Sequence, residues 1–224
     1  MVESYFKLNQ LITVDRPEAV GTIETAINAN LNAFHSLYDL MKQELGKPVD
    51  WYKEPVLCIL LAIRNARHHN KANRIRSIYN YHNQVSEKPT DRRNYFYVDF
   101  PAPPEEEGGN CFDIHLSWGD IDTLLSLQKK DSRLNLEARE IIRDYLNADK
   151  FEEEASYKGF NKDEIFINFV PLALNAGIVL YPYIKDHVKA DSIESESFLH
   201  HFKTTGAALT KQHEYKVIQF SLPK

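Results

Sequence analysis

Hydrophobic side chains are most crowded between Val56 and Ile63, where six of eight positions carry large aliphatic residues. A run this dense exceeds the one-sided stripe of a surface helix, so it predicts a central, buried helix. Pro55 suits the first turn of that helix, because a missing N–H has no helical partner there. Polar residues then fill the last two turns: Arg64, Asn65, Arg67, His68, His69 and Asn70.

Apolar residues at helical spacing predict a second, long amphipathic helix from Pro17 to Leu45, with Gly46 just beyond it. Asn161 and Glu164 have the spacing of a capping box and predict a helix that runs to Tyr183. Further helices are predicted over 71–83, after a kink near Asn70, and over 118–130, 134–146 and 195–203.

Aromatic and β-branched residues predict strands over 95–100 and 111–116, joined as a long-looped hairpin within residues 94–117. The alternating tail over 215–222 could add a strand to this hairpin, and residues 1–17 could form a short strand or arm. The expected architecture is therefore a single, mainly α domain over 1–224 with a small β hairpin or sheet as an appendage.

Composition indicates an ordinary folded protein, with 43% hydrophobic and 26% charged residues. No apolar run approaches the roughly 20 residues of a membrane span, and residues 1–10 lack the apolar core of a signal peptide. We therefore expect a cytoplasmic protein without a membrane partner. Cys58 and Cys111 are expected to be buried thiols, and no Cys/His spacing matches a structural zinc site.

The formal net charge of −5 gives no global attraction for nucleic acid, so any RNA binding must come from a local basic patch. Residues 64–76 provide one, because they contain no Asp or Glu. Aromatic rings beside basic side chains suit single-stranded RNA, whose bases stack on such rings. The candidate RNA-binding residues are Arg67, Lys71, Arg74, Arg76 and Tyr79.

Arg64 and His68 continue the apolar face of the central helix, since they follow Leu57, Leu60 and Leu61 at spacings of three and four residues. Burying a guanidinium without a partner costs several kcal/mol, so Arg64 should face a pocket, an interface or a wet cleft. The alternative is that both side chains only favour the negative end of the helix dipole, worth about 0.3–1 kcal/mol.

Three other groups of polar residues are weaker candidates. His35 lies between the apolar faces of the long helix and is interpreted as a structural histidine. Asp113 and His115 share one strand face, but two ligands without a third predict no metal. The run Glu152–Glu154 is interpreted as a solvated face.

The residues from Arg64 to His69 form an R-N-x-x-x-H string at the end of an apolar helix. This string resembles the signature of the HEPN superfamily. The resemblance implies a HEPN-like helical bundle and, as in the RNases of that superfamily, metal-independent cleavage of RNA by its own 2′-OH, without a cofactor. The family Arg, polar residue and His then fall on Arg64, Asn65 and His69.

The family assignment meets a geometric difficulty in an ideal helix. Residues five apart are separated by about 140° around the axis, so Arg64 aligns better with His68 than with His69. His68 therefore remains a rival for the catalytic role, unless the helix loosens near Asn70 or two motifs converge across a homodimer, which the resemblance implies.

The resemblance also implies a toxin or phage-defence effector, with a neutralising antitoxin protein as a further partner besides RNA. Two alternatives stay open. One is a non-catalytic HEPN-like module that binds a nucleotide, RNA or a protein. The other is a structural or regulatory helical protein whose basic helix end binds an acidic partner.

Overall fold

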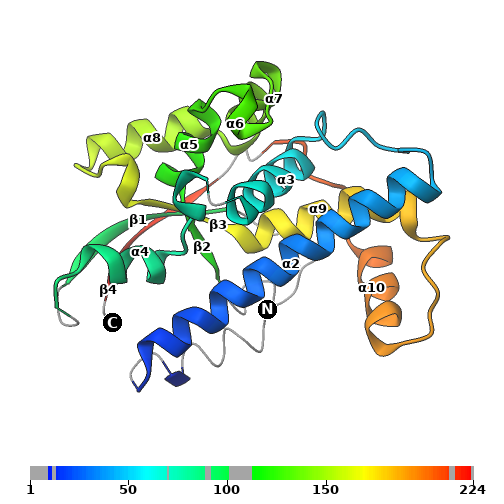
Figure 1. The fold of residues 1–224 in the computed structure, drawn as a ribbon, viewed down its shortest axis with the longest axis horizontal. Helices are drawn as coiled ribbons and strands as arrows, with labels where there is room; N and C mark the ends of the chain where they lie inside the picture. Colours follow the sequence, from blue (N-terminus) through cyan, green and yellow to red (C-terminus); the bar gives the residue numbers. More distant parts are fainter. Residues whose placement is uncertain are drawn as a thin grey trace.

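The computed structural model describes residues 10–11, 14–69, 71–88, 92–100, 113–211 and 215–222. Helices dominate these residues and surround a small sheet, as the sequence predicts (Figure 1). Most of the expected N-terminal strand or arm lies outside the described residues, and so do Asn70 and Cys111. The helix labels therefore begin at α2.

The two longest predicted helices at the start of the chain are confirmed, and they pack against each other. Helix α2 spans Arg16–Glu44, and its first turn is capped by Asp15, whose carboxylate accepts a hydrogen bond from the Glu18 N–H at 3.1 Å. Helix α3 spans Pro55–His68. Every residue from Val56 to Ile63 is at most 3% exposed, so the dense apolar run forms the centre of the core.

The helix predicted over 71–83 begins seven residues late. A 3-10 turn, η1, spans Ala72–Arg74, and Ala72, Arg74 and Ile75 all have positive φ angles. The helix itself, α4, spans Ile78–Val85 and is capped by Ser77. The Lys71 N–H donates to the Ala66 carbonyl at 2.8 Å, so the chain turns away directly after α3.

The predicted hairpin over 94–117 is wrong. Strand β1 (Arg93–Asp99) and strand β2 (His115–Ser117) are separated by a strand from later in the chain, β3 (Ile165–Asn168). The order is β2-β3-β1-β4, in which β3 runs parallel to β1 and antiparallel to β2. The tail does join the sheet, since β4 (Lys216–Leu222) pairs antiparallel with β1.

Strand β3 lies where the sequence predicts the start of a helix. The capping box of Asn161 and Glu164 forms, but it closes only a 3-10 turn, η2 (Lys162–Glu164). Helix α9 (Phe169–Ile184) starts after the strand, capped by Asn168, which accepts from the Val170 N–H at 3.1 Å. A short apolar run fits a buried strand and a buried helix equally well, which explains the error.

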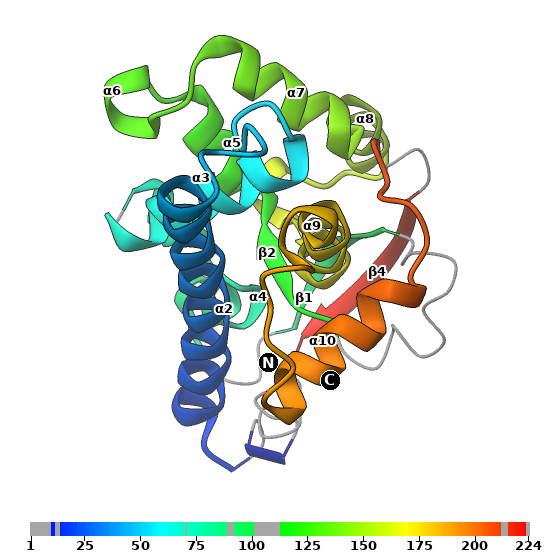
Figure 2. The same ribbon diagram turned by 90° about the vertical axis from the view of Figure 1, so that its right-hand side faces the viewer.

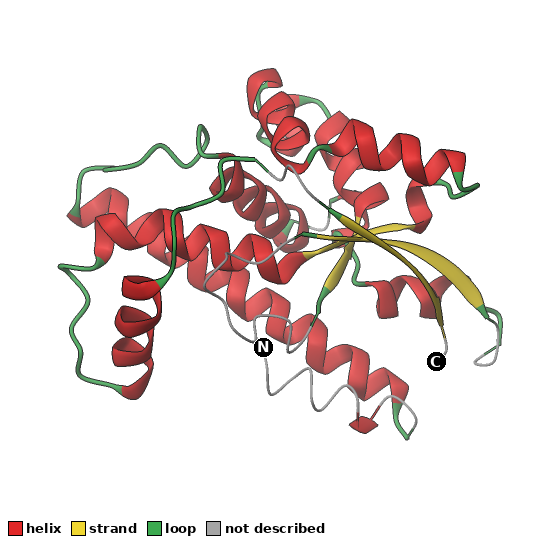
Figure 3. Ribbon diagram, turned by 180° about the vertical axis from the view of Figure 1, so that it is seen from behind, coloured by secondary structure: helices red, strands yellow, loops and turns green. Residues whose placement is uncertain are grey.

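The remaining helices cover the core from several sides. They are α5 (Trp118–Ser126), α6 (Lys129–Ser132), α7 (Leu136–Leu146), α8 (Ala148–Tyr157) and α10 (Ile193–Thr204). Figure 2 views α9 nearly end-on, with α2, α7 and α10 arranged around it. Figure 3 shows the strands gathered at one end of the molecule, away from α10.

Two single-residue expectations have different outcomes. Cys58 is a free, buried thiol, and burial raises its pKa to about 12, as expected for an unreactive core residue. Glu152 does not belong to a purely solvated face: its carboxylate accepts from Trp118 Nε1 at 2.7 Å and pairs with Arg143 at 3.0 Å. None of the helices in the described residues has the length and apolar composition needed to cross a membrane.

Candidate functional site

A polar cavity of about 300 Å³ lies where the C-terminal half of α3 faces α2. On α2, Asn28 and Asn32 line this cavity together with the buried Leu31. The lining side chains are Asn28, Leu31 and Asn32 from α2, Arg64, Arg67 and His68 from α3, and Arg74 from η1.

Arg64 is the least satisfied cation of this cavity. Its Nη1 donates to Asn65 Oδ1 at 3.2 Å, and its Nε is buried and has no hydrogen-bond partner among the described residues. The described residues that line the cavity include no carboxylate. A half-buried guanidinium in these surroundings favours an anion, because the anion would supply the missing charge and acceptors.

Arg67, one turn further along α3, is held by the protein itself. Its guanidinium donates to Glu24, to Asn28 Oδ1 at 2.7 Å and to the Ile75 carbonyl at 2.6 Å, and its side chain is only 6% exposed. Its charge is therefore balanced by Glu24, which argues against the predicted role of Arg67 in RNA binding.

The two neighbouring histidines at the end of α3 lie on different sides of the helix. Both are exposed, and their rings meet nearly at right angles with centroids 4.8 Å apart. His68 lines the cavity of Arg64, as the four-residue spacing predicts. His69 lines a second cavity together with Asn65. Within one chain, the three residues of the motif are thus not assembled in one cavity.

The other predicted RNA-binding residues are scattered. Arg76 forms a two-pronged ion pair with Asp120, at 2.9 Å and 2.7 Å, and its guanidinium stacks over Tyr81. It is therefore a structural residue as well. Tyr79 is half-buried between the core clusters. Arg74 is exposed beside Arg64, whereas Lys71 lines the second cavity.

His35 lies close enough to Arg64 for the positive charge of the guanidinium to affect the pKa of its imidazole. It follows Asn28 and Asn32 on the same face of α2, at spacings of seven and three residues, and pairs with Asp39 at 3.3 Å. Burial, and then the positive charge of Arg64, lower the pKa of His35. The spacing of Asn28, Asn32 and His35 predicts from the sequence that they share one face of α2. Only the fold shows that this face lies near Arg64 of α3.

Asp113 and His115 do not form a metal site. The Asp113 carboxylate accepts from Asn168 Nδ2 at 2.7 Å, and the His115 ring stacks on Tyr97. In the part of the chain that the structure describes, no group of three or more potential ligands is arranged to hold a metal ion.

No protein-family model, curated protein or solved structure matches this chain. The function must therefore be argued from the side chains and their geometry.

Proposed function

We propose that the protein is a metal-independent endoribonuclease of the HEPN type, in which Arg64 binds the scissile phosphate and His68 transfers a proton. The observation that carries the proposal is the Arg64 guanidinium: it faces an open cavity without a balancing carboxylate, beside an exposed imidazole. Helix-end stabilisation alone would not require this guanidinium to be half-buried.

The reaction follows from the chemistry of these two groups. A neutral imidazole can accept the proton of the ribose 2′-OH. The 2′ oxygen then bonds to phosphorus, the bond from phosphorus to the 5′ oxygen breaks, and the 5′ oxygen takes a proton from solvent. Arg64 donates to the phosphate oxygens as negative charge builds up on them, and the product is a cyclic phosphate.

Asn65 supports the site by position. Its Oδ1 accepts from Arg64 Nη1 at 3.2 Å, so it limits the orientations of the guanidinium. The protein would act in the cytoplasm as a toxin or phage-defence effector, form a homodimer and be neutralised by an antitoxin protein. These proposals rest on the same motif, so they stand or fall with the ribonuclease proposal.

The second candidate function is a non-catalytic module that binds RNA, a nucleotide or a protein. The observation in its favour is the separation of His69 from Arg64, because the motif is then incomplete on each side of α3. The ribonuclease proposal meets this objection by giving proton transfer to His68, which lines the cavity of Arg64, so the two functions differ in a measurable property, cleavage.

The test is cleavage of a single-stranded RNA in EDTA. We expect wild-type protein to cleave it, and Arg64→Ala to lower kcat/KM by about 10²–10³, as removal of one charge-stabilising donor does. His68→Ala should lower it by about 10²–10⁴, as loss of a general base does. His69→Ala should lower it by less than about tenfold, because His69 is not the proton acceptor.

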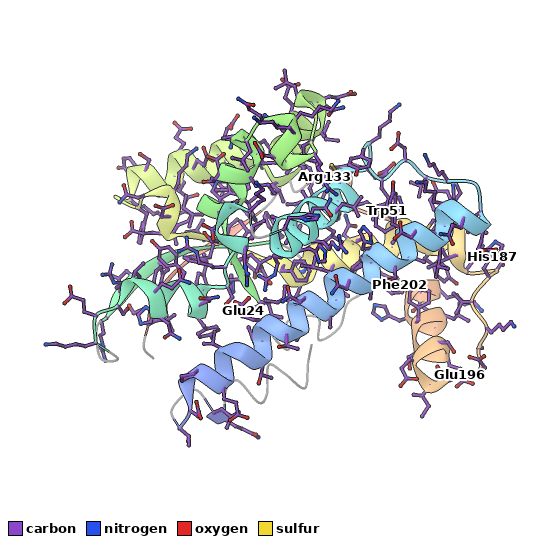
Figure 4. All side chains as sticks on the ribbon, viewed as in Figure 1. Glu24, Trp51, Arg133, His187, Glu196 and Phe202 are labelled. Carbon is purple, nitrogen blue, oxygen red and sulfur yellow. The ribbon has the colours of Figure 1, made fainter. Side chains whose placement is uncertain are left out.

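The control is His187→Ala, which removes an exposed imidazole from the segment after α9, at the opposite end of α9 from the sheet (Figure 4). All variants should keep the helical content of wild type by circular dichroism. Cleavage by Arg64→Ala at the wild-type rate would refute the proposal. Binding of RNA by wild type without any cleavage would favour the non-catalytic module instead.

A further inference from the structure

A second cavity, of about 260 Å³, lies across the end of α3 from the Arg64 cavity, between α3 and the turn of α6. Figure 4 labels Glu24, which accepts a hydrogen bond from Arg67, and Arg133, which lines the second cavity. The polar side chains that line the second cavity are Asn65, His69, Lys71, Lys130, Asp131 and Arg133.

The charges of this cavity are strongly unbalanced. Lys71, Lys130 and Arg133 contribute three positive charges, and Asp131 contributes one negative charge, which leaves two positive charges in excess. Asp131 pairs with Lys71 at 3.3 Å. Neither Lys130 nor Arg133 has an ion-pair partner among the described residues, and both are exposed.

The backbone that carries these cations is fixed. Arg139 of α7 donates to the Leu127 carbonyl, to Ser132 Oγ at 3.1 Å and to the Leu134 carbonyl at 3.4 Å, so it ties down both ends of the α6 turn. Arg133 ends that turn with a φ of 60°, a left-handed conformation that a residue with a Cβ adopts only when its surroundings impose it.

The two cavities share a wall. Asn65 accepts from Arg64 of the first cavity while it lines the second, and the His68 and His69 rings touch across the same helix end. A chain of negative charges that binds at Arg64 would therefore meet a second cationic site after crossing the last turn of α3.

We propose that the second cavity binds an RNA phosphate adjacent to the scissile one, through Lys130, Arg133 and His69, so that a single strand crosses the end of α3. The inference rests on the proposed ribonuclease function and adds a binding subsite to it. It assigns His69 to binding the RNA, and leaves proton transfer to His68.

The electrostatics of His69 agree with this assignment. Desolvation, and then the positive charge of Arg133, lower the pKa of His69, which favours the neutral ring. A neutral imidazole still carries one N–H donor for a phosphate oxygen.

The test is binding of a 2′-O-methyl RNA octamer, which lacks the attacking hydroxyl, measured by fluorescence anisotropy between 0.1 and 1 M salt. Losing the contact with one phosphate of a single strand should reduce the slope of log K against log salt by about 0.7. For Lys130→Ala/Arg133→Ala we therefore expect binding about fivefold weaker than wild type at 0.1 M salt.

The charge-matched control is Lys185→Ala/Lys189→Ala, which removes two exposed lysines beyond the end of α9. Its binding should stay within about twofold of wild type. In the cleavage assay, the Lys130/Arg133 variant should raise KM and leave kcat unchanged, whereas Arg64→Ala should lower kcat.

The outcomes separate the two proposals. Equal binding by the Lys130/Arg133 variant and its control would overturn the subsite, and would leave the ribonuclease standing if Arg64→Ala still lowers kcat/KM by about 10²–10³. A wild-type protein that neither binds the octamer nor cleaves RNA would overturn both. Weaker binding confined to the Lys130/Arg133 variant would support the subsite.

Discussion

Arg64 and Arg76 belong to the same basic stretch, yet the protein treats them in opposite ways. Arg76 has a buried carboxylate, Asp120, on two of its nitrogens, Gln84 on a third and the ring of Tyr81 beneath it. Within the part of the chain that the structure describes, Arg64 bonds to one neighbouring amide and its Nε has no partner. The first guanidinium is a part of the fold, whereas the second has unused binding capacity.

The difference shows that a run of basic residues is not by itself a binding surface. The stretch from Arg64 to Arg76 contains no acid, but the fold supplies Glu24 from α2 to Arg67 and Asp120 from α5 to Arg76. The hydrogen bonds that Arg76 donates to Asp120 raise the pKa of Arg76, which fixes its positive charge beside that carboxylate. What remains for a ligand is the charge that the fold leaves unpaired.

The largest effect on stability should follow loss of Arg76. Asp120 is 1% exposed, so Arg76→Ala would leave a buried, uncompensated carboxylate. We expect the free energy of unfolding to fall by about 3–5 kcal/mol. Urea denaturation measures it, with Arg92→Ala as the control, whose exposed side chain should cost at most about 0.5 kcal/mol. Equal losses for the two variants would show that the Asp120 pair is not structural.

Methionine substitutions should sharpen the contrast between neighbours on α3. Arg67→Met removes three hydrogen bonds and takes the guanidinium partner away from the Glu24 carboxylate. It should therefore lower the free energy of unfolding by about 2–3 kcal/mol. Arg64→Met keeps the apolar stem and removes an unpartnered buried nitrogen, so its cost should stay below about 1 kcal/mol. A larger loss of unfolding free energy in Arg64→Met than in Arg67→Met would contradict this comparison.

The smallest expected effect is a pH dependence of the free energy of unfolding, which arises because Arg64 lowers the pKa of His35. Because burial and Arg64 lower the pKa of His35 in the folded protein, the unfolded chain binds more protons in mildly acidic solution. The contribution of His35 to stability is therefore complete above its ordinary pKa of 6.5 and is lost as the pH falls below it. The free energy of unfolding should decrease from pH 7 to pH 5.

The matched variants separate this contribution from that of other groups. His35→Gln removes the titrating group, so the decrease should be smaller than in wild type. Arg64→Met removes the second cause of the shift, so the decrease should lie between those of wild type and His35→Gln. Identical slopes in all three proteins would mean that Arg64 and His35 do not interact.

The pattern of the chain was enough to predict α2, α3 and the predominance of helix. These helices are long, and their apolar periodicity is set by local spacing. The same pattern led to a hairpin within 94–117 and hid β3 inside a predicted helix, because the strand order depends on contacts between residues about 70 positions apart. The tail strand was predictable, since alternation is local, but its partner β1 was assigned only through the hairpin.

The candidate site divides in the same way. The sequence alone determined that Arg64 and His68 share a helix face, because a helix repeats every 3.6 residues. Only the tertiary structure decided that Arg67 and Arg76 are neutralised, that His69 faces a different cavity, and that Lys130 and Arg133 stand beside it. The reason is that charge compensation acts through space, and spacing along one helix does not reveal which acids and bases other segments bring to it.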